Sequence, residues 1–396
     1  MRDARDVLTA PGAYWGSLTR PEQYVSLAIG GFVLLLFGSV LTGGLTPSYF
    51  LFLLSLGGMY ALLSFGLNSQ WGFTGLINFS VAAFFGLGAY GTALMTADSS
   101  PIAGGFSPFV GLFVAIVLAV VLAVLIGIPT LRLRADYLAI ASLGLAEVLR
   151  LVIKNEGDIT NGTAGVRGIP DFFVGIPVLG TFPETMVTVR IWVPGLSTLV
   201  LDTSFWRMLL SLVIVAAFVG VSYAVLRRAH RSPWGRVLRT IRSDEDLAQA
   251  LGKRTYSFKM QSFVLGSVIM ALGGVFYAHL NLFVDPTLLD PVTTFYVWVA
   301  VMLGGSGSNR GALLGGMVIV AIREGTRFLN GIEAIPFDVA PLRLLVIGVL
   351  IVLLMRFRPQ GILPPQRELI WPSVVEDAPK QPESGVREAK GGASDE

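Results

Sequence analysis

Cysteine is absent from this 396-residue chain, and histidine occurs only at His230 and His279. Without thiols the chain can form no disulfide, no iron–sulfur cluster and no cysteine nucleophile. The two histidines are too few and too far apart for the ligand spacing of a metal site. No catalytic triad and no carboxylate pair of the kind used in a soluble cleft is evident. These absences predict a protein with no catalytic residues and no metal ligands.

Charge is also scarce. Charged residues make up 14% of the chain and hydrophobic residues 53%, whereas soluble globular chains carry about 25% charged residues. The mean hydropathy is +0.70. The net charge of +3 does not indicate nucleic-acid binding, because the basic residues gather between long apolar runs. Repeated apolar runs of roughly 20 residues are typical of transmembrane helices. The predicted fold class is therefore all-α, in a polytopic membrane protein.

Ten apolar segments are expected to span the membrane. They are 25–41, 49–67, 73–95, 106–128, 137–153, 205–226, 260–280, 292–303, 311–328 and 341–355. The eighth is too short to cross at about 1.5 Å per residue, so we expect a broken helix or borrowed flanking residues there. The first follows a polar segment and is expected to be an uncleaved span, not a signal peptide.

A basic interruption at 227–259 sets the predicted orientation. It holds nine Lys and Arg: Arg227, Arg228, Arg231, Arg236, Arg239, Arg242, Lys253, Arg254 and Lys259. Cytoplasmic loops carry an excess of such residues, and an even number of spans puts both termini on one side. The sequence thus predicts a cytoplasmic N-terminal segment (1–24), a transmembrane domain (25–358) and a cytoplasmic, disordered tail (359–396). The loop 154–204 would be an ordered outer cap with short elements.

The basic loop contains signals for one short helix. Ser243 is a suitable N-cap with Asp246 as its capping-box partner. Three acidic residues crowd the first turn, where the helix dipole favours negative charge, and Gly252 is the expected left-handed stop. About two turns of helix are too short to be stable alone. The segment is either a docking element for a partner or a solvated connector. It comprises Ser243, Asp244, Glu245, Asp246, Leu247, Ala248, Ala250, Leu251 and Gly252.

Five spans precede the outer loop and five follow it, which makes the two halves inverted in the membrane. Glycines interrupt the third span and the region of spans eight and nine. Interruptions in matching places of inverted halves indicate a transport pathway. The alternative is tight helix packing, for which the four-residue spacing of Gly311 and Gly315 is suited. Candidate pathway residues are Asn68, Asn78, Glu147, Arg150, Gly304, Gly305 and Gly307.

Several polar residues fall within or beside the apolar runs. Glu147 and Arg150 lie three apart on one helix and can pair. They could meet the charged ends of an amino acid, or simply neutralise each other. Asn68, Gln70 and Asn78 could line a pathway or hydrogen-bond helix to helix. A second charged cluster, toward the outer end of span nine, is Arg323, Glu324 and Arg327.

Several segments, in order, resemble the permeases of branched-chain amino-acid ABC transporters, specifically the LivM-type subunit. The similar segments are NSQWGFTGLINFSVAAFFGLGAY (68–90), RADYLAIASLGLAEVLRLV (134–152), TNGTAGVRGIP (160–170), the loop and span at 235–278, and LGGSGSNRGALLGG (303–316). Arg310 departs from the family, which more often has an apolar or aromatic residue there. The resemblance covers roughly 50–360.

The resemblance implies a function in a larger assembly. In that family a short Ala-rich helix ending in glycine docks into a groove of a cytoplasmic ATPase, and DLAQALG (246–252) fits this pattern. The implied partners are a LivH-type sister permease, two ABC ATPase subunits and an extracytoplasmic substrate-binding protein. ATP and Mg would be bound by the ATPases, and the chain would lie in a prokaryotic cell membrane.

Two other functions stay open from the sequence. The same architecture could carry urea or another small polar solute. An ion-coupled secondary transporter could share inverted halves, although it would need no docking helix and intramembrane acids are few. The run Gly252-Lys253-Arg254-Thr255 is not a phosphate-binding loop, since it lacks the first glycine and a Ser or Thr directly after the lysine. The chain is therefore expected to bind no nucleotide itself and to be no enzyme.

Overall fold

The computed structural model describes residues 38–40, 45–175, 181–186, 188–192, 198–329, 345, 348–349, 352, 356 and 360–363. Helices dominate this part, which confirms the predicted helical class. The helices are α4 (Pro47–Leu67), the π-helix η1 (Asn68–Gly72), α5 (Val81–Thr96), α6 (Pro108–Thr130), α7 (Ala135–Asn155), α8 (Gly157–Thr160), η2 (Gly162–Ala164), η3 (Phe172–Gly175), α9 (Phe182–Thr185), α10 (Thr203–Arg231), α11 (Pro233–Ser243), α12 (Glu245–Ala250), α13 (Thr255–Asn281), η4 (Pro286–Leu289), α14 (Pro291–Gly304) and α15 (Asn309–Leu329). The strands are β1 (Val166–Arg167), β2 (Val189–Trp192), β3 (Thr198–Leu201) and β4 (Phe283–Val284).

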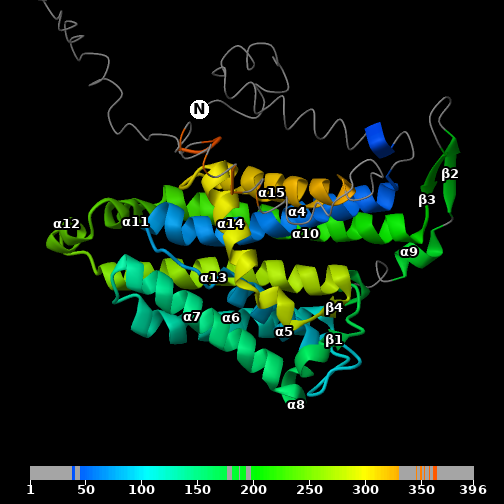
Figure 1. Cartoon of the computed structure of the whole chain (residues 1–396), viewed down its shortest axis with the longest axis horizontal. Helices are drawn as coiled ribbons and strands as arrows, with labels where there is room; N and C mark the ends of the chain where they lie inside the picture. The colour runs from blue at the N-terminus through cyan, green and yellow to red at the C-terminus, as the bar shows by residue number, and fades with distance from the viewer. Residues whose placement is uncertain are drawn as a thin grey trace, which may run out of the picture. The chain divides into compact units, whose positions relative to one another are not determined.

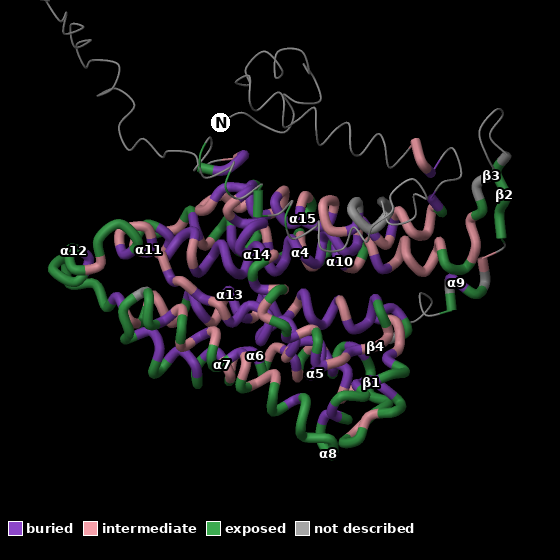
Figure 2. Tube along the Cα trace, viewed as in Figure 1, coloured by how far each residue is buried: buried purple, intermediate pink, exposed green. Residues whose placement is uncertain are grey.

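The long helices run side by side, with α11 and α12 at one end and α8, β1 and β4 toward the other (Figure 1). Helix α13 is central and packs against α4, α5 and α6. Figure 2 shows that α4, α5 and α13 are buried along much of their length. Their core includes Phe65, Phe84 and Phe263, all fully buried. The rings of Phe84 and Phe263 meet edge to face at 5.8 Å, an arrangement favoured by aromatic quadrupoles.

Four of the described helices are long and apolar enough to cross a membrane: α4 with η1, α6, α10 and α13. The outer helices of the bundle show apolar side chains on their free faces. On α6, Phe113 is 68% exposed and Leu125 63%, and on α10 Val221 is 64% exposed. In water such a surface would be costly, whereas in a bilayer it faces hydrocarbon. The exposed apolar residues of α6 and α10 therefore support a membrane-embedded fold.

Two apolar helices are too short to span alone. Helix α14 has 14 residues, or roughly 21 Å at 1.5 Å per residue, against a hydrocarbon core of about 30 Å. This length confirms the prediction that the eighth apolar segment is too short to cross the membrane. Helix α5 begins only at Val81, so the predicted continuous span 73–95 is wrong in its first part. There the helical residues Phe73 and Thr74 continue from η1, the chain turns at Gly75 (φ 79°), and no helix follows until Val81. We call 73–80 the first break.

Other predicted boundaries agree to within a few residues, except that α10 continues past Leu226 to Arg231 and α13 begins at Thr255, five residues before the predicted start. The predicted spans 25–41 and 341–355 fall almost entirely outside the described residues, so the count of ten spans stays a prediction. The N-terminal segment 1–24 also lies outside them, as does the tail apart from 360–363.

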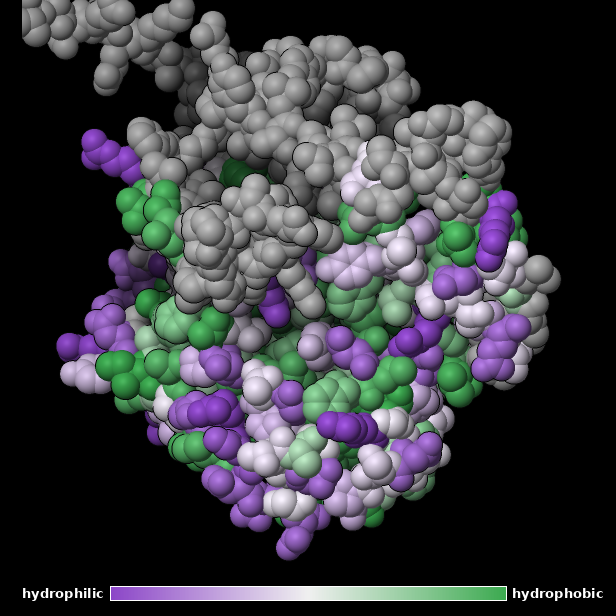
Figure 3. Space-filling view, turned by 45° about the vertical axis from the view of Figure 1, so that its right-hand side comes forward, coloured by the Kyte–Doolittle hydropathy of each residue, from purple (hydrophilic) through white to green (hydrophobic). Residues whose placement is uncertain are grey.

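The outer loop contains short elements, as predicted: α8, η2, β1, η3, α9, β2 and β3. Strands β2 and β3 pair antiparallel with each other. Strand β1 pairs antiparallel with β4, setting Val166 opposite Val284 and Arg167 opposite Phe283. The loop is thereby joined to the chain between α13 and α14. In Figure 3, which brings the right-hand side of Figure 1 forward, hydrophilic and hydrophobic residues are interspersed over this face.

Candidate functional site

The short helix of the basic loop is α12, and it starts one residue later than predicted. Asp244 is its N-cap: the carboxylate Oδ1 accepts from the Leu247 backbone N–H at 2.9 Å. Ser243 instead ends α11, and its hydroxyl donates to the Arg239 carbonyl at 3.0 Å. Asp is as good a cap as Ser and adds negative charge at the helix dipole. The predicted Ser243–Asp246 capping box is therefore wrong, whereas Gly252 has the expected left-handed backbone (φ 75°).

The apolar residues of α12 do not form one face. Ala248 is fully buried against the rest of the protein, while Leu247 and Leu251 are 52% and 64% exposed. These two leucines lie four residues apart and so share one side of the segment. Ala250 is exposed as well. The result is a small apolar surface displayed at one end of the helix bundle, with Ala248 as its anchor.

Side chains from α13 hold α12 in place. The Lys259 ammonium forms an ion pair with Glu245. The Gln249 amide donates to the Thr255 hydroxyl at 3.2 Å. A local backbone bond, from the Lys253 N–H to the Ala248 carbonyl at 3.1 Å, closes the end of α12. A helix of six residues needs such tertiary contacts, because it cannot be stable alone.

Helix α11 was missed in the sequence. Ser232 followed by Pro233 is a start signal, since Pro is favoured at the first helical position. Leu238 and Ile241, three residues apart, are buried on its inner side. Near its end, Arg242 donates to the Gly72 carbonyl and, at 3.1 Å, to the Ser306 hydroxyl. Partial burial lowers the pKa of Arg242, and the guanidinium stays charged because that pKa starts far above neutral.

His230 was also missed. Its ring stacks on Phe73 with a centroid separation of 3.5 Å and lies parallel to the Trp234 ring at 6.1 Å. Its Nδ1 lies 3.3 Å from the Asn309 amide nitrogen. His230 thus packs the end of α10 between the first break, α11 and the start of α15. No local pattern indicated this role, because Phe73 and Asn309 lie far from His230 in the sequence.

The second break is the turn between α14 and α15, residues 305–308. Gly305 has φ 113° and Gly307 φ 85°, values that side-chain-bearing residues rarely adopt. The two helices meet closely there: a Cβ on Gly304 would lie 1.9 Å from the Gly311 carbonyl oxygen, and one on Gly315 would lie 1.9 Å from that of Ala300. The predicted close packing at Gly311 and Gly315 is confirmed.

The second break contacts η1, the π-helix that leads into the first break. The side-chain oxygen of Asn68, in η1, accepts from the Gly307 N–H at 2.7 Å, and its amide donates to Asn309 Oδ1 at 3.2 Å. Asn68 is fully buried. A Cβ on Gly72 would lie 2.5 Å from the Gly307 nitrogen. Candidate residues Asn68, Gly305 and Gly307 are thus brought together, by a hydrogen bond between helices.

Gln70 and Asn78 bind the first break to α13. The Gln70 amide donates to the Phe263 carbonyl at 2.8 Å and to Ser267 Oγ at 3.2 Å, and Asn78 donates to Gln70 Oε1 at 2.7 Å. Both residues are fully buried. A buried amide costs little only when it is hydrogen-bonded. In this conformation these amides join helices and do not face an open channel.

Helix α14 supports the start of α5. Thr294 Oγ1 accepts from the Ala82 N–H at 3.0 Å, and Trp298 Nε1 donates to the Asn78 carbonyl at 3.1 Å. The Trp298 ring also stacks on Phe79, with centroids 5.0 Å apart. The first N–H groups of a helix have no partner within it. Thr294 of α14 therefore supplies the acceptor that the Ala82 N–H lacks within α5, and the two short helices are joined inside the bundle.

Glu147 and Arg150 pair on α7, as predicted, at 2.5 Å and 2.8 Å. Their side chains are about one third and one quarter exposed, so the pair lies at the surface of α7, away from the junction of the breaks. Arg323 and Glu324 lie 3.7 Å apart, and Arg323 also contacts the Tyr60 hydroxyl. The Arg327 side chain lies outside the described residues.

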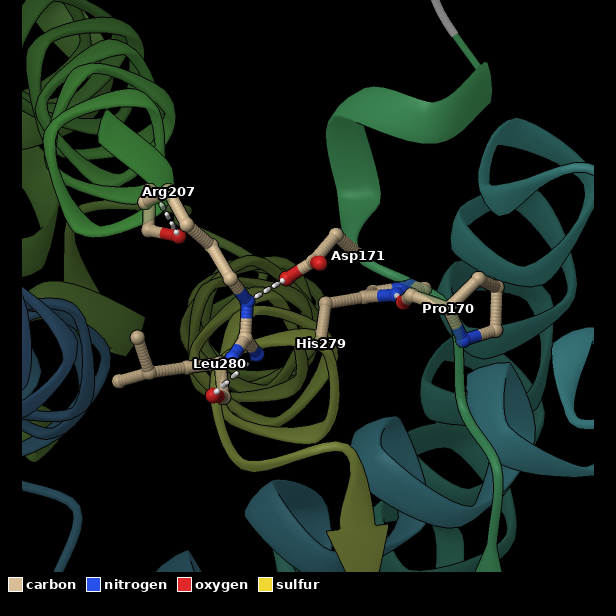
Figure 4. Close-up of polar contacts among 6 residues, drawn as sticks. Pro170, Asp171, Arg207, His279 and Leu280 are labelled. Carbon is tan, nitrogen blue, oxygen red and sulfur yellow. Dashed lines mark hydrogen bonds and ion pairs between the residues drawn. The ribbon is translucent and has the colours of Figure 1, made fainter. Parts of the chain in front are cut away.

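A polar cluster at the opposite end fixes the outer loop (Figure 4). Arg207 Nε, from α10, donates to Asp171 Oδ1 at 2.6 Å and its Nη2 contacts the Leu280 carbonyl at 3.4 Å. His279 Nδ1 lies 2.7 Å from the Pro170 carbonyl oxygen. Burial raises the pKa of Asp171, and this outweighs the lowering by Arg207. The outer loop is thus tied to α10 and to the end of α13.

Interrupted helices enclosed in a membrane bundle are typical of transporters, because irregular backbone is tolerated only where protein or water surrounds it. The fold and the junction of breaks therefore place the chain among polytopic membrane transport proteins. Residues 49–355 match the family model for "Branched-chain amino acid transport system / permease component", and the chain belongs to this family.

Relatives agree with this assignment. The chain is 30% identical over 317 residues to the high-affinity branched-chain amino acid transport system permease protein LivM of Escherichia coli K12, covering 78% of this chain and 68% of the relative. It is 26% identical to the probable LivM permease of Methanocaldococcus jannaschii, over 80% of this chain and 93% of the relative. It is also 24% identical to the LivH permease of Salmonella typhimurium LT2, over 67% of this chain and 80% of the relative.

Proposed function

We propose that this chain is the LivM-type permease subunit of an ATP-driven importer of branched-chain amino acids. Its relatives carry this substrate in their names, and it is related to both LivM and LivH permeases. Those two likenesses support pairing with a LivH-type sister permease. The chain would lie in a prokaryotic cell membrane with both termini in the cytoplasm, since the basic loop 227–259 favours that orientation.

The observation that carries the proposal is the surface of α12. Leu247, on α12, and its C-cap Leu251 are exposed at one end of the bundle, and contacts with α13 hold the helix. A cytoplasmic ATPase subunit is the partner we propose for this surface, with ATP and Mg bound by two such subunits. An extracytoplasmic binding protein would deliver substrate at the opposite end, where the ordered outer loop lies.

Reconstitution tests the proposal. The chain, a LivH-type permease, two ATPase subunits and a substrate-binding protein from the same organism are placed in liposomes, and uptake of labelled leucine is measured with and without ATP. We expect uptake that needs ATP and both ATPases. Uptake driven by a proton or sodium gradient through this chain alone would instead indicate a secondary transporter. Binding of leucine, valine and urea to the binding protein then identifies the substrate, and urea binding alone would overturn the amino-acid assignment.

A further inference from the structure

Arg242 lies where α11 meets both breaks. Its guanidinium donates one hydrogen bond to the Gly72 carbonyl and a second, at 3.1 Å, to Ser306 Oγ. Gly72 ends η1 and Ser306 belongs to the turn after α14. The last carbonyls of a helix have no partner within it, and arginine is well suited to bind them. One side chain therefore joins the cytoplasmic helix pair to two segments that are far apart in the sequence.

The first break also packs against Arg242. Gly75 has φ 79°, and a Cβ built on it would lie 3.3 Å from Arg242 Cγ and 3.6 Å from Arg242 Cα. The left-handed turn at Gly75 thus runs directly over this end of α11. A shift of α11 would press on the break through the backbone of Arg242 as well as through its guanidinium.

The connection between Arg242 and α12 is short. Ser243 ends α11, and the next residue, Asp244, is extended (φ −158°, ψ 108°) and caps α12. The same end of α12 is fixed to α13 by the Lys259–Glu245 ion pair, and the far end by the hydrogen bond from Gln249 to Thr255. A force on the exposed leucines of α12 would therefore reach Arg242 through only two intervening residues, Ser243 and Asp244.

The two breaks are also connected beyond Arg242. The chain leaving the first break is bound by α14 at Asn78 and Ala82, through Trp298 and Thr294. The same α14 ends at Gly304, next to Ser306. Arg242, the first break, α14 and the second break thus form a closed ring of contacts. A movement of Arg242 acts on both ends of α14 together.

We propose that Arg242 is the positioning residue that transmits movement of α12 to the two breaks and so sets the conformation of the permease. This inference rests on the proposed function, because the movement is supplied by ATPase subunits docked on α12. The acceptors of Arg242 are a carbonyl and a hydroxyl, neutral groups whose directional hydrogen bonds can break and re-form as α11 shifts.

The first test measures uptake per ATP hydrolysed in the reconstituted complex. Arg242→Gln should lower this ratio about tenfold or more, since hydrogen bonds to a charged group shift equilibria on that order. Hydrolysis itself should continue, because the docking surface is intact. Arg242→Lys should fall between, as an ammonium lacks the guanidinium fork that reaches two acceptors. The matched control, Arg236→Gln, removes an exposed arginine of the same helix and should stay within about twofold of wild type.

The second test does not depend on transport. Hydrogen–deuterium exchange is followed in the assembled complex in lipid nanodiscs. In Arg242→Gln, exchange should accelerate in segments 73–80 and 305–309 and stay unchanged in α6, whereas Arg236→Gln should match wild type throughout. If Arg242→Gln does not assemble, the uptake ratio and exchange of Arg242→Lys decide instead.

The results separate the possible failures. A wild-type uptake ratio in the Arg242 variants, or unchanged exchange of both breaks in them, would overturn the role of Arg242. A wild-type complex that imports no substrate with ATP would overturn the proposed function, and the exchange result would still show whether Arg242 restrains the breaks.

Discussion

Asn68 offers the sharpest test of how the breaks are held. Replacement with Ala removes the acceptor for the Gly307 N–H, at 2.7 Å, and the donor to Asn309, at 3.2 Å. Asn68 is fully buried and its partners Gly307 and Asn309 are partly buried, so water replaces these hydrogen bonds only incompletely. An unsatisfied buried donor costs about 1–3 kcal/mol, and the second bond adds about 1 kcal/mol. Asn68→Ala should therefore lower the free energy of unfolding by about 2–4 kcal/mol.

The assay is unfolding by SDS titration from mixed micelles, followed by tryptophan fluorescence. Asn281→Ala serves as the control, because that amide is exposed and makes only a 3.3 Å contact to the Tyr277 carbonyl. The control should change stability by no more than about 0.5 kcal/mol. If Asn68→Ala were as stable as Asn281→Ala yet lost transport, Asn68 would act as a pathway residue, and its proposed role in joining the breaks would be refuted.

Three further predictions concern other parts of the molecule. Leu251→Asp, or Gly252→Val at φ 75°, should uncouple uptake from ATP hydrolysis while the protein stays folded; a folded variant with normal ATP-driven uptake would contradict the role of α12. Gly274→Ala sets a Cβ 1.9 Å from the Phe85 carbonyl oxygen and should destabilise by about 1–3 kcal/mol, whereas Gly220→Ala, in open space, should be neutral or stabilising by up to about 1 kcal/mol; equal effects would refute the α5–α13 contact. A double-mutant cycle of Arg207→Gln and Asp171→Asn should give an interaction energy of about 1–2 kcal/mol at pH 7. Burial raises the folded-state pKa of Asp171 above its unfolded value, so acidification favours the folded state through this carboxyl. Protonation of Asp171 also removes its charge, and the interaction energy of the Arg207–Asp171 pair should therefore shrink as the pH falls. An interaction energy that grew on acidification would contradict the ion pair.

The sequence predicted those elements whose signals are local. Apolar runs located the spans, and Gly252 marked the end of α12 because a left-handed residue there needs glycine. The choice between Ser243 and Asp244 as the cap could not be made, since both residues accept hydrogen bonds equally well. Helix α11 was missed because the basic residues obscured its apolar positions, although Ser232-Pro233 is a start signal.

Contacts between distant segments could not be predicted from one sequence. Asn68 and Gly307 were each candidates, but their hydrogen bond spans 239 positions and depends on how α4 and α15 pack. Arg242 was counted only as one of nine positive charges. Its role depends on the position of Gly72 and Ser306 in space, which no local pattern records.

The most direct test of the account is whether α12 contacts an ATPase. Because the chain has no native cysteine, Leu251→Cys gives a single attachment site for a thiol-linked photocrosslinker, and Asp158→Cys, exposed on α8 at the other end of the bundle, is the matched control. In the assembled complex, illumination should link the Leu251 site to an ATPase subunit and leave the Asp158 site unlinked to it. An ATPase that co-purifies with the chain but never links to the Leu251 site, or links to the Asp158 site, would contradict the account.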